Sequence, residues 1–204
     1  MSMPARSYPG GRRTDRSAAT RRKITDAVAE LMAEGAFHAS TVEQVADRAG
    51  ISRATLYQHF GSRLDLIDGI CERFDANPAL VAIRRVIDLP DPGAAVDETI
   101  AGAVGFWSSQ DAILAQLYGV AAIDSAAREF VGRQRRDRRG EMVRLAERLE
   151  RDGWLRPGLG AEQALPLLMV LTSYETFCEL RLAGLADAAI AATLQRSARE
   201  LLSA

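Results

Sequence analysis

Histidine and cysteine, the residues most often used for catalysis and metal binding, are scarce in this chain. Only His38, His59, Cys71 and Cys178 occur among its 204 residues, without CxxC or HExxH spacing. A GxSxG nucleophile motif and a glycine-rich phosphate loop are also absent from the sequence. These absences argue against an enzyme and predict no metal or other cofactor. Two cysteines so far apart indicate unpaired thiols in a reducing cytoplasm.

Long apolar runs are missing as well. No stretch without a charged residue exceeds twelve residues, whereas a membrane-spanning helix needs about twenty apolar residues. The arginines near the N-terminus are followed by no apolar segment, so no secretion signal is expected. These features predict a globular protein of the cytoplasm that makes no contact with a membrane.

The charge is unevenly distributed, although the net charge is only −1. Residues 1–63 hold ten Arg and Lys against six Asp and Glu, a balance of +4, whereas residues 64–204 hold sixteen against twenty-one, a balance of −5. A basic N-terminal third on an acidic remainder is typical of a small nucleic-acid reader joined to another domain.

The segment between residues 41 and 63, TVEQVADRAGISRATLYQHFGSR, has the pattern of two short helices joined by a tight turn. Thr41 can cap the first helix together with the glutamine at the third helical position. Gly50 is placed to end that helix in the left-handed conformation, and Ser52 can cap a second helix that runs to about His59. A helix-turn-helix has this layout, and its second helix normally enters the major groove of DNA.

The second helix of this motif carries different chemistry on its two sides. Leu56 and Phe60 lie four residues apart and are expected to face the protein. Arg53 could donate two hydrogen bonds to a guanine, and Gln58 could pair with an adenine. The side chains predicted to face bases are Arg53, Ala54, Tyr57 and Gln58.

This segment resembles the DNA-binding signature of the TetR/AcrR family of one-component transcriptional regulators. Ala54 departs from the signature, because many members have glycine there, whereas the rest of the chain matches the family only in length and helical character. The positions that carry the resemblance are Thr41, Val45, Ala46, Ala49, Gly50, Ile51, Ser52, Thr55, Leu56, Tyr57, His59, Phe60, Ser62 and Arg63.

The resemblance implies that a set of hydroxyl, imidazole and guanidinium groups contacts the DNA backbone. Structural alternatives exist for three of them: Thr41 is also a helix cap, Tyr57 could pack on the helix surface, and His59 could bond to the protein. The residues to which the resemblance assigns phosphate contacts are Thr41, Ser52, Thr55, Tyr57, His59 and Arg63.

The complete chain is predicted to be all-α, with three parts. Residues 1–14 form a flexible basic arm, in which Arg12 and Arg13, with Arg16 just beyond, either follow the DNA or are simply solvated. Residues 15–61 form a three-helix domain that contains the helix-turn-helix. Residues 62–204 form a helical domain for effector binding and dimerisation. Further helices are predicted at about 15–34, 78–88, 94–109, 111–122, 125–152, 161–184 and 187–202.

The last two predicted helices suit a dimer, which a small helix-turn-helix usually needs for specific binding. Residues 161–184 contain a segment that is apolar nearly all round, and residues 187–202 have an apolar stripe with small neighbours. The resemblance implies a four-helix dimer interface here, whereas the alternative is an intramolecular core. The candidate interface residues are Leu165, Leu168, Thr172, Ile190, Leu194, Ala198 and Leu201.

The resemblance also implies a pocket for a small, mostly apolar effector in the middle of the chain. Aromatic residues at helical spacing could equally be ordinary core, because pockets and cores share one composition. The candidate pocket residues are Phe106, Trp107, Leu114, Leu117, Tyr118, Tyr174, Phe177 and Cys178.

The function predicted from these features is that of a homodimeric DNA-binding repressor, released from a palindromic operator by a small hydrophobic ligand. The alternative is an architectural DNA-binding protein that responds to no ligand and binds DNA without sequence preference. A basic run from Arg133 to Arg139 could hold an anion or touch DNA, but its acidic neighbours favour a solvated helix face.

Overall fold

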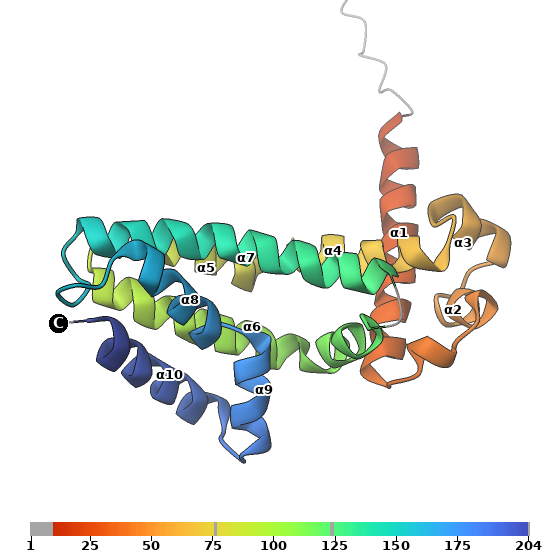
Figure 1. The fold of residues 1–204 in the computed structure, drawn as a ribbon. Helices are drawn as coiled ribbons and strands as arrows, with labels where there is room; N and C mark the ends of the chain where they lie inside the picture. Colours follow the sequence, from red (N-terminus) through yellow and green to blue (C-terminus); the bar gives the residue numbers. More distant parts are fainter. Residues whose placement is uncertain (1–9, 76, 123–124, 204) are drawn as a thin grey trace, which may run out of the picture. The chain divides into compact units, whose positions relative to one another are not determined.

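The protein is built from helices. The computed structural model describes residues 10–75, 77–122 and 125–203, and within these ranges no strand forms. This confirms the all-α prediction. The elements in chain order (Figure 1) are α1 (Gly10–Ala33), the 3-10 helix η1 (Phe37–Ala39), α2 (Val42–Arg48), α3 (Arg53–His59), α4 (Arg63–Asp75), α5 (Pro78–Val86), α6 (Pro92–Val120), α7 (Ser125–Arg151), α8 (Ala161–Leu171), α9 (Tyr174–Leu182) and α10 (Asp187–Leu202).

The chain divides into two compact units, residues 1–71 and residues 72–204. The division lies inside α4 rather than at its start, where the sequence suggested a boundary. Leu66, Ile67 and Ile70 of α4 are buried, each at most 1% exposed. The first turns of α4 therefore contribute apolar side chains to the first unit.

One apolar face of α1 provides much of the core of the first unit. Ile24, Val28 and Met32 recur at helical spacing and are at most 1% exposed. The α2 helix packs on α1 and α3 packs on α2. Each apolar side chain buried in this way contributes roughly 1.5–3 kcal/mol relative to leaving it exposed.

Phe60 joins this core through a close approach to α4. A Cβ added at Gly69 would come within 2.7 Å of the Phe60 ring and 3.0 Å of the Thr25 methyl group. Any larger residue at position 69 would therefore displace the ring. No local sequence signal points to this role of Gly69, because it depends on a residue nine positions away.

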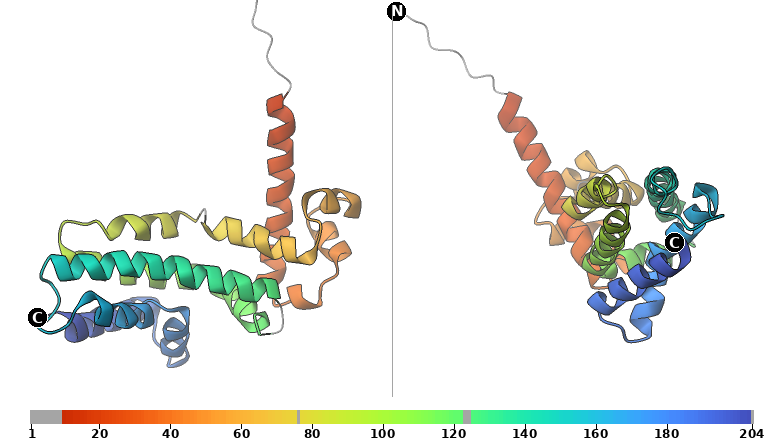
Figure 2. Two further views of the ribbon diagram at one scale, coloured as in Figure 1. Left: turned by 45° about the horizontal axis from the view of Figure 1, so that its top comes forward. Right: turned by 90° about the vertical axis from the view of Figure 1, so that its left-hand side faces the viewer.

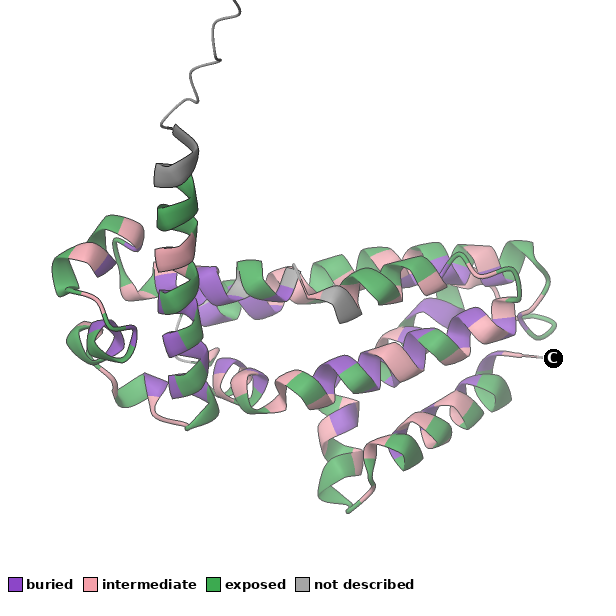
Figure 3. Ribbon diagram, turned by 180° about the vertical axis from the view of Figure 1, so that it is seen from behind, coloured by how far each residue is buried: buried purple, intermediate pink, exposed green. Residues whose placement is uncertain are grey.

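The second unit is organised around α6. The α5, α7 and α10 helices all pack on α6, while α8 packs on both α7 and α10. The α6 and α7 helices run side by side (Figures 1 and 2). Along the helices of this unit buried residues alternate with exposed ones, as expected when one face of a helix is covered (Figure 3).

Two helix predictions in the second unit are wrong. The predicted helices at 94–109 and 111–122 are a single helix, α6, capped at its start by Asp91, whose side chain accepts the Gly93 N–H at 3.0 Å. No glycine or proline stands at 110 or 111 to stop it. Conversely, the predicted helix 161–184 is broken into α8 and α9.

The break between α8 and α9 has a local and a tertiary cause. Ser173 is extended and its side chain accepts the Thr176 N–H at 3.1 Å, which restarts the helix as an N-cap. The carbonyl of Thr172 accepts the indole N–H of Trp107 at 3.2 Å. A residue from α6 thus satisfies a carbonyl that the interrupted helix leaves free.

Candidate nucleic-acid interface and ligand cavity

The α2 helix begins at a capping box formed by Thr41 and Gln44. The Thr41 hydroxyl accepts the Gln44 backbone N–H at 3.2 Å, and the Gln44 side chain accepts the Thr41 backbone N–H at 2.7 Å. Both bonds satisfy donors that a helix start leaves unpaired. Thr41 is exposed, so a contact with a phosphate would be a second use of a hydroxyl that already has a structural role.

The turn between α2 and α3 has the predicted geometry. Gly50 has a φ of 66°, the left-handed conformation that ends α2. The Ile51 N–H then donates to the Ala46 carbonyl at 3.0 Å. Ser52 caps α3, since its side chain accepts the Thr55 N–H at 3.1 Å, and the two hydroxyls lie 2.8 Å apart. Hydrogen bonds within the turn and the cap therefore fix the start of α3.

The α3 helix buries one side and exposes the other. Leu56 and Phe60 are each 1% exposed. Thr55 and His59 are half-buried at the edges of the outer face. The exposed residues of the predicted DNA-contacting set on this helix and at its cap are Ser52, Arg53, Ala54, Tyr57 and Gln58.

Arg53 is held in place by two neighbours. Its Nη1 lies 2.5 Å from Oε1 of Glu43 on α2, and its guanidinium lies 5.4 Å from the centre of the Tyr57 ring. A hydrogen bond to Tyr57 and the charge of Glu43 raise the pKa of Arg53 above its ordinary value. The sequence analysis missed Glu43, which would have to release Arg53 before that side chain could extend to a base.

Arg63 serves the protein's own backbone. Its Nη1 donates to the Ser40 carbonyl at 2.6 Å, its Nη2 donates to the Phe37 carbonyl, and its guanidinium stacks over the Phe37 ring at 4.2 Å. Arg63 therefore ties the start of α4 to η1 and to Ser40, the residue that follows η1. Backbone bonds of this kind leave less of the guanidinium for the phosphate contact that the resemblance implied.

Two arginines that are not part of the recognised motif connect the helix-turn-helix to α1 and to the residue that follows it. Arg48 on α2 pairs with Glu34 through two bonds, at 2.7 and 2.9 Å, and this pairing lowers the pKa of Glu34. Arg21 of α1 donates to the His59 carbonyl at 3.3 Å and stacks over Phe60 at 4.3 Å. Sequence reasoning missed both, because the pairs span 14 and 38 positions.

The predicted basic arm is only partly within the described chain. Residues 1–9 and the side chains of Arg12 and Arg13 lie outside the described part. The α1 helix begins at Gly10, earlier than the predicted residue 15. Arg16 lies on this helix, within the range where the sequence also predicted a helix, and its side chain is exposed.

The second unit contains a cavity of about 70 Å³ lined by residues of α5, α6 and α7 together with Thr172. Phe106, Trp107 and Met142 contribute apolar walls, and Arg138 and Glu141 contribute charged groups. Ligand pockets are typically about 300–1,000 Å³. The cavity therefore suits a small group as it stands, and a larger ligand would require it to expand.

Of the eight residues predicted for the pocket, Phe106 and Trp107 line this cavity. Leu114, Leu117 and Phe177 are buried core. Trp107, Tyr118 and Phe177 each contact the ring of Tyr174. The Tyr174 hydroxyl donates to Asp111 at 2.6 Å, and burial together with this bond raises its pKa. Burial likewise raises the pKa of the half-buried Cys178 thiol.

The arginine run on α7 is divided between surface and interior. Arg133 and Arg135 pair with Glu129 and Glu175, respectively. Arg136 and Arg139 are exposed. In contrast, Arg138 lines the cavity, and its Nη1 is buried without a hydrogen-bond partner. The expectation of a solvated face therefore describes part of the run only.

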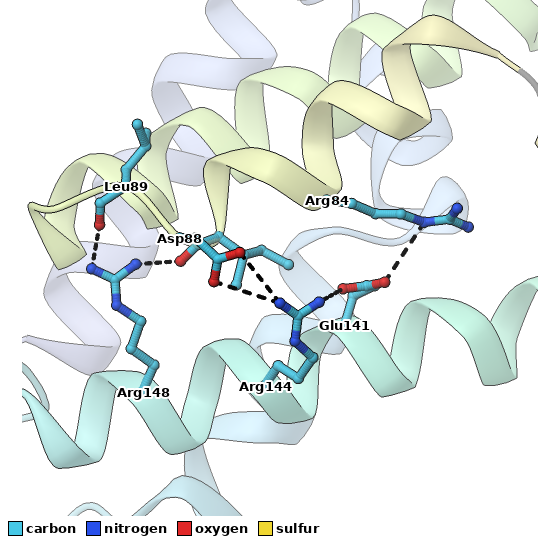
Figure 4. A network of polar contacts seen from close by, with 7 residues as sticks. Arg84, Asp88, Leu89, Glu141, Arg144 and Arg148 are labelled. Carbon is cyan, nitrogen blue, oxygen red and sulfur yellow. Dashed lines mark hydrogen bonds and ion pairs between the residues drawn. The ribbon is translucent and has the colours of Figure 1, made fainter.

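A polar network joins α7 to the end of α5 and the loop that follows (Figure 4). Glu141 lies 3.6 Å from Arg84 and 2.9 Å from Arg144, which also lies 3.4 Å from Asp88. Arg148 donates to the carbonyls of Ile87, Leu89 and Pro90. Arg148 thereby satisfies backbone acceptors just beyond the C-terminus of α5.

Six of the seven residues predicted for the dimer interface are covered by the chain itself. They are at most 9% exposed, whereas Leu201 is 39% exposed. The α10 helix packs on both α6 and α8, so its apolar stripe contributes to the intramolecular core. The six buried residues are Leu165, Leu168, Thr172, Ile190, Leu194 and Ala198.

No group of three or more His, Cys, Asp or Glu side chains in the described residues could hold a metal ion. Among the described helices, none combines the length and the apolar character that crossing a membrane would require.

Residues 24–70 match the family model of bacterial regulatory proteins of the tetR family. The transcriptional activator FasR of Mycolicibacterium smegmatis is 36% identical over 66 residues, which are 31% of this chain and 30% of that protein. YdeS of Bacillus subtilis, described as an HTH-type transcriptional regulator, is 26% identical over 158 residues, or 75% of this chain and 76% of YdeS. This chain thus aligns with less than a third of FasR but with most of YdeS.

The fold as a whole also has counterparts among solved structures. The SmeT–triclosan complex has a TM-score of 0.73 and 19% identity, covering 91% of this chain and 92% of SmeT. At this identity the likeness concerns the fold alone. Residues 24–70 therefore form a helix-turn-helix domain of the tetR family of bacterial regulatory proteins, and the chain as a whole is similar to YdeS in sequence and to SmeT in fold.

Proposed function

We propose that this protein is a DNA-binding transcriptional regulator whose α3 helix enters the major groove. The observation that supports this most strongly is the division of α3 into a buried side and an exposed side. Leu56 anchors the helix, while Arg53 and Gln58 stand exposed with side chains that suit base edges. The caps at Thr41 and Ser52 fix the starts of α2 and α3 and so hold this surface in place.

The contacts fall into two classes. Arg53, Ala54, Tyr57 and Gln58 would face bases. Hydroxyl and imidazole groups at the cap of α2, at the cap of α3 and along α3 would hold phosphates, helped by the backbone N–H groups at the two helix starts. Arg63 would act chiefly by fixing η1 and α4, given its bonds to the carbonyls of Phe37 and Ser40. The proposed phosphate contacts are Thr41, Ser52, Thr55, Tyr57 and His59.

The active form would be a homodimer formed through the outer faces of α8 and α10. Val170 and Leu201 are exposed there, at 59% and 39%, and Leu182 at the end of α9 is 82% exposed. Exposed Ala189 and Ala192 on α10 would allow close helix approach. A symmetric dimer requires a palindromic operator.

Dimerisation can be tested separately from DNA binding. Val170→Asp places a charge on the proposed interface and should produce a monomer in sedimentation experiments. Val81→Asp is the matched control, because Val81 of α5 is also exposed, at 37%, but lies away from α8 and α10. A Val170→Asp protein that remains dimeric would refute this interface.

The regulator would act as a repressor that a small, mostly apolar ligand releases from its operator. SmeT, a structural relative, is seen in complex with triclosan, which supports a ligand-binding role for a unit of this fold. Release requires that the ligand bind the DNA-incompetent arrangement more tightly than the competent one. Because FasR is named an activator, transcription from the isolated operator must be measured with and without protein.

The first experiment is selection of duplexes from a random-sequence library by the purified protein. Wild type should enrich one palindromic motif, and Arg53→Ala should lose preference at defined base pairs of each half-site. Arg139→Ala, on the exposed surface of α7, is the control and should enrich the same motif as wild type. Recovery of duplexes without any motif, with a steep salt dependence, would indicate an architectural DNA-binding protein and overturn the proposal.

A further inference from the structure

We propose that the cavity of the second unit selects a small apolar carboxylic acid, whose carboxylate pairs with Arg138 and Thr99. This inference deepens the proposed function and rests on it for its regulatory meaning, because it names the chemical class of the releasing ligand. The binding site itself depends only on the residues that line the cavity.

Arg138 supplies the cation. It lines the cavity, and its Nη1 is buried without a hydrogen-bond partner. Burial lowers the pKa of Arg138 below its ordinary value, which means that the guanidinium is poorly compensated for lost hydration. A guanidinium remains charged in proteins, so an anion that enters the cavity gains a charge-assisted hydrogen bond.

Each nearby carboxylate either forms an ion pair with another arginine or is exposed to solvent. Glu175, which lies close enough to influence Arg138, pairs with Arg135. Glu141 lines the cavity but is shared by Arg84 and Arg144 (Figure 4). Asp137 also lines the cavity, yet it is exposed, so solvent screens its charge. None of these groups satisfies Nη1 of Arg138.

Thr99 supplies a second donor on another helix. It lies on α6, is 1% exposed, and lines the same cavity. Its hydroxyl has no hydrogen-bond partner within the chain. A buried hydroxyl left unsatisfied is costly. A carboxylate has two oxygens and could therefore accept from Arg138 and Thr99 at once.

The remaining walls define the apolar part of the ligand. Ile83, Ala103, Phe106, Trp107 and Met142 line the space beside the two donors. At about 70 Å³ the cavity is about half the size of an engineered cavity that holds benzene. The ligand is therefore a compact acid: a short branched body fits with the least adjustment, and an aromatic body requires the cavity to expand.

The test compares acids with their uncharged amides. Phenylacetate and phenylacetamide, and benzoate and benzamide, are titrated by calorimetry into the full-length protein without DNA. An acid should bind at least about tenfold more tightly than its amide, since a charge-assisted bond is stronger than a neutral one. Arg138→Gln should remove that preference, and Thr99→Val should weaken binding of the acid.

Arg139→Gln is the matched control, because it removes a charge from the exposed surface one position further along α7. It should bind the acid as wild type does. Equal binding of acid and amide, equal loss in both arginine variants, or no binding of any of the four compounds would overturn the inference. Because DNA is absent, these outcomes do not depend on operator binding. A protein that selects a palindrome but fails this test would keep the proposed DNA-binding function and lose only the ligand class.

Discussion

The two units differ in where the polar groups that could bind a partner lie. In the first unit the candidate groups are on the outer side of a short, capped helix, and an exposed partner such as Glu43 holds Arg53. In the second unit two buried groups without a hydrogen-bond partner, Nη1 of Arg138 and the Thr99 hydroxyl, belong to residues that line the cavity. An outward set suits a large charged partner, and an inward set suits a small molecule that can be enclosed. The proposed function would use both kinds of surface within one chain.

The largest effect is expected from breaking the core beneath the outer face of α3. Phe60→Ala should destabilise the first unit by about 3–5 kcal/mol, because removing the buried ring that packs against Gly69 and Arg21 leaves a cavity. Hydrogen exchange of α1–α3 measures this loss. Tyr57→Ala, on the exposed side of the same helix, should change stability little. Similar losses in both variants would mean that α3 does not have two distinct sides.

The next largest effect is expected on DNA affinity, when Arg53 is removed from the outer face of α3. Arg53→Ala should reduce affinity for the selected operator on the order of ten- to hundredfold and relax the preference at one base pair of each half-site. Fluorescence anisotropy with the selected and a scrambled duplex measures both quantities. An equal loss on the two duplexes would assign Arg53 to the phosphates instead.

A matched pair of glycine substitutions tests whether local backbone physics is the same in both units. Gly50 and Gly153 have φ values of 66° and 68°, and an added Cβ would meet nothing within 4 Å at either position. Gly50→Ala and Gly153→Ala should therefore each cost about 1–2 kcal/mol from conformation alone. Denaturant unfolding gives both values, and a much larger loss at one position would reveal a tertiary role for that turn.

A smaller effect of opposite sign is expected inside the second unit. Arg138→Met removes an unsatisfied buried donor and keeps the apolar stem, so ligand-free protein should be stabilised by about 1 kcal/mol. Thermal unfolding without ligand measures this change. Destabilisation would show that Arg138 holds the fold, and would weaken the argument that it awaits an anion.

The smallest effect concerns the partner of Arg53. Glu43→Gln frees Arg53 and removes a negative charge from the surface near the proposed phosphates. Affinity for DNA should rise severalfold at low salt and return toward the wild-type value at high salt, because exposed pairs are weak and screened. A decrease in affinity would mean that Glu43 orients Arg53 for binding.

Much of the first unit could be predicted from the sequence because its signals are local. The capping box at Thr41, the stop at Gly50 and the cap at Ser52 each depend on residues within one turn, and each has the expected geometry. The helices predicted at 125–152 and 187–202 agree closely with α7 and α10, and the left-handed Gly153 follows α7. The pairing of Arg21 with the end of α3 could not be predicted, since it joins positions far apart in the chain.

The second unit was less predictable because its helices present apolar residues on several faces. The continuity of α6 and the interruption at Ser173 were both missed, and the Trp107 bond to the Thr172 carbonyl has no counterpart in local sequence. The cavity lies beside the predicted aromatic cluster, not within most of it. Periodicity identifies the apolar faces of a helix, but it does not say which neighbour covers each face.

The sequence by itself determined the helical class, the helix-turn-helix and the residues that α3 exposes, because caps, stops and apolar spacing act over a few residues. Tertiary structure alone decided that Arg63 bonds to the carbonyls of Phe37 and Ser40, that Ile190 and Leu194 are covered by the chain's own helices, and that Nη1 of Arg138 is buried in a cavity without a hydrogen-bond partner. The physical reason is that burial and pairing depend on which distant surfaces meet, and that information is shared among all the helices of a unit.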